Sequence, residues 1–231
     1  MEQIVTMPII VEFNGLPGSG KTTIADELKK KIEKTGCEVS NSYFKRRYHR
    51  YGVLVILNPS YWKLIKSIIK YSKLFEEKKS LSMILHVVSF VRSYHDFIRG
   101  KKKEVLIVDQ GFVQGIISLA HQELLPQTSC LDDILKISNI NSNAFVCVNC
   151  NVNEVISDER ITRRPMNGCR VESMEKNERM KTLAIQKENF SFLRKSIIRI
   201  CPNIICVDID TENNVLDNVE NIFKTIASNE S

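Results

Sequence analysis

A glycine-rich loop near the start of the sequence carries residue types that bind phosphate. Residues 15–22 fit the pattern G-x-x-x-x-G-K-[ST] at every position. The backbone amides of such a loop can turn inward onto phosphate oxygens, and the helix that follows adds partial positive charge. Lys21 would place a cation on the β- and γ-phosphates, and Thr22 would offer a hydroxyl to Mg²⁺. The loop therefore predicts binding of ATP and Mg²⁺ by Gly15, Pro17, Gly18, Ser19, Gly20, Lys21, Thr22 and Thr23.

An acidic residue closes the clearest apolar run of the sequence. Residues 104–108 precede Asp109 and are apolar enough for a central parallel strand. In open α/β sheets, ligands bind at the carboxyl ends of the strands. Asp109 is therefore a candidate to hold Mg²⁺ through water or to accept the proton of an attacking oxygen. The structural alternative is that Asp109 caps the following helix.

Arginines cluster around a loop that contains proline and glycine. This loop spans residues 163–170, between two segments with helical patterns. The arginines clustered around it are Arg160, Arg163, Arg164 and Arg170. Planar guanidinium groups match the oxygens of a phosphoryl group in transfer. We expect residues 160–172 to form a lid, with Arg160 and Arg164 as the catalytic arginines; the alternative is a solvated basic loop.

The apolar periodicity alternates between strand and helix from one end of the chain to the other. It predicts strands at residues 9–13, 37–43, 104–109, 144–148 and 203–208. It predicts helices at residues 22–35, 59–79, 81–98, 112–122, 131–138, 153–163, 171–196 and 211–227. This order indicates an α/β fold of three layers, the P-loop NTPase fold, with a central parallel sheet of about five strands and helices on both faces. The 231 residues suit a single domain, with a helical region at about 43–99 on the acceptor side.

Composition narrows the partners and the compartment. The net charge of +6 favours anionic partners, and a basic cluster at residues 45–50, which includes Arg47, would hold an anionic acceptor, bind nucleic acid or form an exposed loop. No nucleic-acid-binding module is recognisable. Seven cysteines without a secretory signal favour reduced thiols and a cytoplasmic location. No apolar stretch approaches the roughly 20 residues of a bilayer span, so no membrane is expected as a partner.

These motifs and their order resemble the thymidylate kinase superfamily of P-loop kinases. The resemblance is carried by residues 13–23, by residues 90–96 ahead of residues 108–111, and by residues 207–211. It implies that the helix around residue 92 lines an acceptor site and that the loop after the last strand packs on adenine. Gln110 stands where the family carries arginine. The site residues implied in this way are Arg92, His95, Asp96 and Gln110 for the acceptor and Asp210 for the nucleotide. Arg92 and Asp96 would alternatively form a surface ion pair.

The sequence thus predicts an ATP-dependent kinase that phosphorylates a nucleoside monophosphate or a related small acceptor. One alternative is a P-loop ATPase or polynucleotide-kinase-like protein that acts on nucleic acid. Another is a non-catalytic regulator, although the guanine motif [NT]-K-x-D of GTPases is not present. The helix at residues 81–98 offers an apolar face for a possible homodimer.

Overall fold

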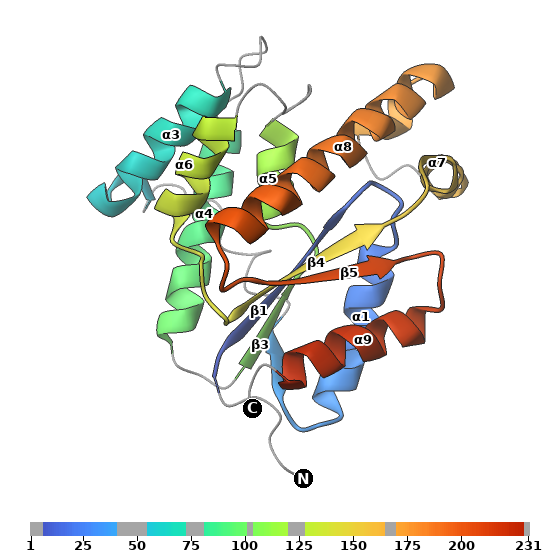
Figure 1. The fold of residues 1–231 in the computed structure, drawn as a ribbon, viewed down its shortest axis with the longest axis horizontal. Coiled ribbons are helices and arrows are strands. Elements are labelled where there is room, and N and C mark those ends of the chain that lie inside the picture. The colour runs from blue at the N-terminus through green and yellow to red at the C-terminus, as the bar shows by residue number, and fades with distance from the viewer. Residues whose placement is uncertain are drawn as a thin grey trace.

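A sheet of five parallel strands forms the centre of the molecule, in the order β2-β3-β1-β4-β5 (Figure 1). The computed structural model describes residues 7–40, 55–72, 81–100, 104–119, 128–164 and 170–228. The strands are β1 (Ile9–Gly15), β2 (Glu38–Ser40), β3 (Glu104–Val108), β4 (Phe145–Asn151) and β5 (Ile205–Asp210). The predicted five-stranded parallel sheet is confirmed.

Helices connect the strands in the predicted order. They are α1 (Lys21–Glu33), α3 (Trp62–Ser72), α4 (Leu81–Arg99), α5 (Phe112–Leu119), α6 (Thr128–Ser138), α7 (Glu154–Arg163), α8 (Lys176–Ile200) and α9 (Val215–Ser228). Short 3-10 turns, η1 (Pro59–Tyr61) and η2 (Arg170–Ser173), precede α3 and α8. The helix expected at residues 171–196 is therefore divided, because Glu175 has an extended ψ of 148° and α8 begins only after it.

Alternation along the strands divides the core between the two faces of the sheet. Ile9, Val11 and Phe13 of β1 pack with α1 and α9 on one face. Ile10, between them, packs on the other face with α3, α4, α5, α6 and α8. Figure 1 shows α1 and α9 below the sheet and the larger helical layer above it. Glu12 lies two residues after Ile10 and shares its face of the sheet, so its carboxylate points into the larger helical layer.

Helix α4 buries most of its apolar residues inside this chain. Val87, Val88, Phe90, Val91 and Tyr94 are all at most 3% exposed. The exposed large apolar side chains of α4 are Leu81 and Met83. The apolar face considered for a homodimer is therefore mostly occupied by this chain's own core. None of the helices in the described ranges combines the length and the apolar character of a membrane span.

Candidate phosphate and acceptor site

The phosphate loop leaves the carboxyl end of β1 and runs into α1. Gly15 ends β1 with φ +144°, and a Cβ there would lie 2.5 Å from the carbonyl oxygen of Cys150 on β4. Only glycine permits this backbone geometry and this close approach. Gly20 stands at the N-cap of α1, so the positive end of that helix points at the loop.

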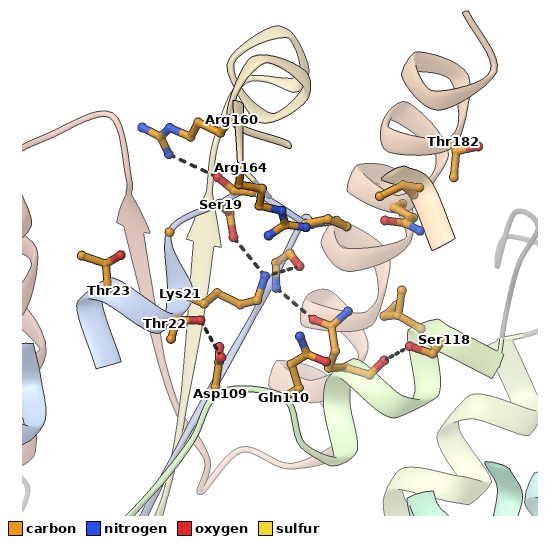
Figure 2. A pocket seen from close by; sticks show the side chains of 18 of the residues that line it. Ser19, Lys21, Thr22, Thr23, Asp109, Gln110, Ser118, Arg160, Arg164 and Thr182 are labelled. Carbon is orange, nitrogen blue, oxygen red and sulfur yellow. Dashed lines mark hydrogen bonds between the residues drawn. The ribbon is translucent and has the colours of Figure 1, made fainter. Parts of the chain in front are cut away.

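Lys21 lies over the loop as the motif requires. Its Nζ donates to the carbonyl oxygens of Gly15 and Leu16, at 3.0 and 2.7 Å, and to Ser19 Oγ at 3.2 Å. The side chain is buried, with 7% exposed. Figure 2 shows the ammonium group inside the loop, at the place where a β- or γ-phosphate would be contacted.

Thr22 and Asp109 meet although 87 residues separate them. Thr22 Oγ1 donates to Asp109 Oδ2 at 2.7 Å (Figure 2). The other carboxylate oxygen, Oδ1, is buried and has no hydrogen-bond partner among the described residues. A hydroxyl and an unpartnered carboxylate oxygen beside a phosphate loop fit Mg²⁺, which prefers oxygen ligands and is bound by few protein groups together with water and phosphate. The described chain contains no cluster of three or more His, Cys, Asp or Glu that would hold a metal ion by itself.

A cavity of about 840 Å³ opens beside the loop. This volume lies in the range of small-molecule sites. The phosphate loop and Asp109 form one side (Figure 2). Most of the rest is formed by the turn before α5, by helices α4, α5 and α8 and by the segment before α8, with Met83, Gln110, Gln114, Ile117, Ser118, Val171, Met174, Glu178, Thr182 and Gln186.

Two of the predicted lid arginines line this cavity. Arg160 lies on α7, and its Nη2 donates to the carbonyl oxygen of Thr211 at 3.1 Å, while Nη1 approaches the carbonyl oxygen of Gly18 at 3.5 Å. Arg164 forms an ion pair with Glu172 at 2.8 Å. Its Nε is buried without a hydrogen-bond partner in the described ranges. In contrast, Arg163 is 80% exposed and pairs with Glu159.

The residues predicted from the sequence do not all converge. Every predicted residue of the phosphate loop lines the cavity, as do Asp109, Gln110, Arg160 and Arg164. The predicted acceptor residues of α4 do not. Arg92 pairs with Asp96 at 3.6 Å, which is the alternative considered for them, and His95 Nδ1 lies 3.2 Å from Tyr61 Oη. Burial lowers the pKa of His95, with the Asn139 carbonyl opposing that effect. Arg47 lies outside the described residues.

Asp210 has a local structural contact instead of a place in the cavity lining. Its Oδ1 accepts from the Glu212 amide at 2.9 Å and so stabilises the turn after β5. The neighbouring Thr211 is the residue that contacts Arg160, through both its carbonyl oxygen and its hydroxyl. Thr211 therefore connects the loop after the last strand to the phosphate site.

Several lining residues carry no motif in the sequence. Gln114 Oε1 accepts from the amide of Gly15 at 3.4 Å and so joins α5 to the phosphate loop. Met83, Ser118, Thr182 and Gln186 reach the cavity from three helices. The sequence does show which of them share a helix face, because residues one or two turns apart on α8 lie on the same side of the helix. Which face turns toward the loop is set by tertiary packing.

The cysteine behind the loop is not a nucleophile at neutral pH. Burial raises the pKa of the Cys150 thiol to about 12, with Asp109 adding to the rise and Lys21 opposing it. The thiol is therefore neutral under ordinary conditions. The groups available for chemistry at the site are therefore its oxygen, ammonium and guanidinium groups.

Comparison with known proteins supports the fold. No family model and no curated protein sequence matches the chain. Among solved structures, deoxyadenosine kinase from M. mycoides with the products dCMP and a flexible dCDP matches with a TM-score of 0.52 and 19% identity, over 95% of this chain and 99% of that chain. The same enzyme with bound dATP matches with a TM-score of 0.50 and 18% identity, over 94% and 98% of the two chains. The predicted P-loop NTPase fold is thus confirmed along almost the whole chain.

Proposed function

We propose that the chain is a kinase that transfers the γ-phosphate of ATP to a hydroxyl group of a nucleoside. The observation that carries this proposal is the meeting of Lys21, Thr22 and Asp109 at one wall of the cavity. A phosphate-gripping loop, a metal-binding pair and an adjoining acceptor space are the three parts that phosphoryl transfer requires. The structural likeness to deoxyadenosine kinases supports the same reading.

Each residue has a distinct task in this reaction. The loop amides and Lys21 bind the β- and γ-phosphates, and Arg160 and Arg164 stabilise the charge that spreads over the phosphoryl oxygens during transfer. The acceptor hydroxyl attacks the γ-phosphorus, the bond from the γ-phosphorus to the oxygen shared with the β-phosphate breaks, ADP leaves, and the hydroxyl proton passes to an oxygen of the transferred phosphoryl group. Closure of the lid side excludes water, which would otherwise accept the phosphoryl group.

Thr22 Oγ1 and Asp109 would hold Mg²⁺ at the end of the loop. The metal ion supplies neutralisation of the phosphate charge. The hydrogen bond between these two side chains and the unpartnered Asp109 Oδ1 favour this role over that of a general base.

The lining of the acceptor side favours a nucleoside over a nucleoside monophosphate. Among the described lining residues, the cations are Lys21 at the end of the loop, Arg160 of α7 and Arg164 directly after α7. Ser118 and Thr182 lie across the pocket from Arg160 (Figure 2). The far side offers amides and hydroxyls with apolar walls from Met83 and Ile117. Amide side chains can pair with the edge of a base, whereas an acceptor phosphate would need a further cation.

The test is ATP turnover against a matched panel of nucleosides, the corresponding monophosphates, sugars and an oligonucleotide with a free 5′-hydroxyl. We expect a nucleoside to give the highest kcat/KM, with its monophosphate at least about 10-fold lower, a difference of roughly 1.4 kcal/mol in transition-state stabilisation. Lys21→Ala serves as the inactive control. Preference for a monophosphate or for the oligonucleotide would contradict the proposed acceptor, and full turnover by Lys21→Ala would contradict the site.

A further inference from the structure

A buried carboxylate lies directly behind the phosphate loop. Glu12 of β1 has no exposed surface and precedes Gly15 by three residues. Its Oε1 accepts from the backbone amides of Val113 at 2.7 Å and Gln114 at 3.3 Å. Its Oε2 accepts from the amide of Phe112 at 3.1 Å and from Tyr94 Oη at 2.8 Å. The carboxylate thus receives four hydrogen bonds.

These amides belong to the first turn of α5, which has no cap of its own. The first amides of a helix lack partners within the helix, and a side chain at the N-cap usually accepts from them. Gly111 precedes α5 and has no side chain, so Glu12 from another element supplies the acceptor. A Cβ at Gly111 would lie 2.6 Å from Glu12 Cδ and would collide with Tyr94 Oη. The negative charge also faces the positive end of α5.

The first turn of α5 and the short segment between β3 and α5 carry two contacts of the site. Asp109 lies three residues before Phe112 and meets Thr22. Gln114, within the turn, meets the amide of Gly15. A shift of α5 would therefore move the metal-binding carboxylate and an acceptor-side amide together, away from the phosphate loop.

We propose that Glu12 is a positioning residue, which holds the first turn of α5, and with it Asp109 and Gln114, against the phosphate loop. This inference rests on the proposed kinase function for its effect on turnover, but its structural part does not. Glu12 does not line the cavity, so it acts through α5.

The surroundings of Glu12 act on the pKa of its carboxyl in two opposite directions. Burial raises the pKa of the Glu12 carboxyl to about 7, against the hydrogen bonds from Tyr94 and from the amides of α5, which lower it. In the described part of the chain, the titratable groups that face it are Tyr94 from α4 and the thiol of Cys147 from β4. Helix α5 presents backbone amides, and the neighbour on β3 is the apolar Val108. All four partners of Glu12 are donors, so the ionised carboxylate can accept all four hydrogen bonds. A proton on the carboxyl would occupy one of the oxygen lone pairs that these donors use.

Activity and stability then respond to pH in opposite directions. Turnover rises as pH increases through about 7, because the ionised carboxylate holds α5 in register. The contribution of Glu12 to the free energy of unfolding falls over the same range. Its pKa is higher in the folded chain than in the unfolded chain, so the folded state binds the proton more tightly, and that advantage is complete below the unfolded value of 4.5 and lost as pH rises through about 7.

The kinetic experiment compares Glu12→Gln, Tyr94→Phe and Tyr61→Phe with the native chain between pH 5.5 and 8.5. Glu12→Gln keeps the shape but not the charge, and we expect kcat to fall roughly 10- to 100-fold, the scale of lost supporting interactions around a metal site, with the rise near pH 7 abolished. Tyr94→Phe removes one donor, so the midpoint of the rise should move to higher pH. Tyr61→Phe is the matched control, because Tyr61 is a buried tyrosine of the same core that contacts His95 and not Glu12.

The structural experiment uses amide hydrogen exchange on the same proteins without any substrate. We expect the protection factors of the Phe112, Val113 and Gln114 amides at pH 8 to fall at least about 10-fold in Glu12→Gln and to be unchanged in Tyr61→Phe. Unchanged protection in Glu12→Gln would overturn the positioning role, whether or not the chain is a kinase. If Glu12→Gln does not fold, Tyr94→Phe decides: a kcat midpoint and α5 protection equal to those of the native chain would overturn it. Lost α5 protection without detectable kinase activity in the native chain would support positioning and contradict the proposed function.

Discussion

Two residues that follow different strands, Lys21 after β1 and Asp109 after β3, lie at the phosphate end of the site. Lys21 provides a fixed cation, which three oxygen acceptors of the loop hold in place. Asp109 adds an anion through its hydrogen bond from Thr22, the residue directly after Lys21. In the proposed kinase, Lys21 would attract the phosphate oxygens directly and Asp109 would attract them through a divalent cation, so the two side chains together would orient the phosphate chain.

Replacement of Asp109 tests the metal-binding role. Asp109→Asn keeps the acceptor for Thr22 but removes the charge, so Mg²⁺ should bind more weakly and kcat should fall by at least roughly 100-fold, which corresponds to about 3 kcal/mol. The measurement is turnover as a function of Mg²⁺ and Mn²⁺ concentration. Partial recovery at high metal concentration supports a metal ligand. Loss of turnover without any metal rescue, together with a lost pH dependence, would instead identify a general base.

Asp133→Asn is a suitable control for this experiment. Asp133 is an exposed carboxylate on α6 and does not line the cavity. It should leave both turnover and the metal midpoint unchanged. An equal effect of both substitutions would show that net charge, and not the position of Asp109, governs turnover.

The residue types of the phosphate end were predictable, and those of the acceptor end were not. Residues 15–22 and Asp109 follow strands directly, so chain order alone places them at one edge of the sheet. Gln114 and Gln186 lie 72 positions apart and line the same cavity only after α5 and α8 pack in the fold. Glu12 did leave a signal, since a carboxylate within the apolar run of β1 is costly to bury without hydrogen bonds. That signal indicates a partner but not which one.

At the scale of elements, the lid side depends on how α7 is held. Arg179 of α8 pairs with Asp158 of α7 through a buried contact and also donates to the carbonyl oxygen of Met174 at 2.8 Å. Ser157 of α7 donates to the carbonyl oxygen of Pro17 in the loop at 2.6 Å. Helix α7 is thus attached to both α8 and the phosphate loop, which keeps its Arg160 beside that loop.

Two arginines of α7 and its end allow a matched comparison. Arg164 lines the cavity and Arg163 points to solvent, although they are adjacent. Arg164→Ala should lower kcat by roughly 100- to 1,000-fold, the scale of one lost transition-state donor, with ATP affinity changed much less. Arg163→Ala should change neither, because its pair with Glu159 is exposed. The measurements are kcat, KM and ATP binding by calorimetry. Equal losses of kcat and affinity in Arg164→Ala would indicate a ground-state contact instead of a lid role.

The order of the elements could be predicted from the sequence, because the apolar periodicity of each helix or strand and the residues that begin or end it are local features of the chain. The glycine and lysine at the start of α1 and the apolar run of β3 located two of the crossover connections between parallel strands. The division of residues 170–200 into η2 and α8 could not be predicted, because the extended backbone at Glu175 is tied to tertiary contacts and not to the local sequence. It lets α8 begin where the Glu175 carbonyl oxygen accepts from the Arg179 amide at 2.9 Å, with Arg179 then directed at Asp158.

For the molecule as a whole, the site draws residues from the sheet and from the helices on both of its faces. The phosphate loop begins in the sheet and ends in α1, whereas Asp109 and Gln114 introduce the opposite helical layer. The lid arginines come from a third cluster that packs around Leu16, Ile161 and Leu183. A ligand that bridges these parts binds the folded chain and not the unfolded chain, so it must stabilise the fold as a unit.

Magnesium and ATP should therefore raise the melting temperature of the protein. At a ligand concentration 100 times Kd the added stability is about 2.7 kcal/mol, and for a chain of this length that corresponds to a rise of roughly 5–10 °C. Thermal unfolding measured with and without the nucleotide checks this, at fixed pH and salt. Lys21→Ala should melt near the native temperature without ligand, yet lose most of the shift, because its ammonium group no longer meets the phosphates. A native chain that melts at one temperature at every nucleotide concentration would contradict the phosphate site on which the kinase proposal depends.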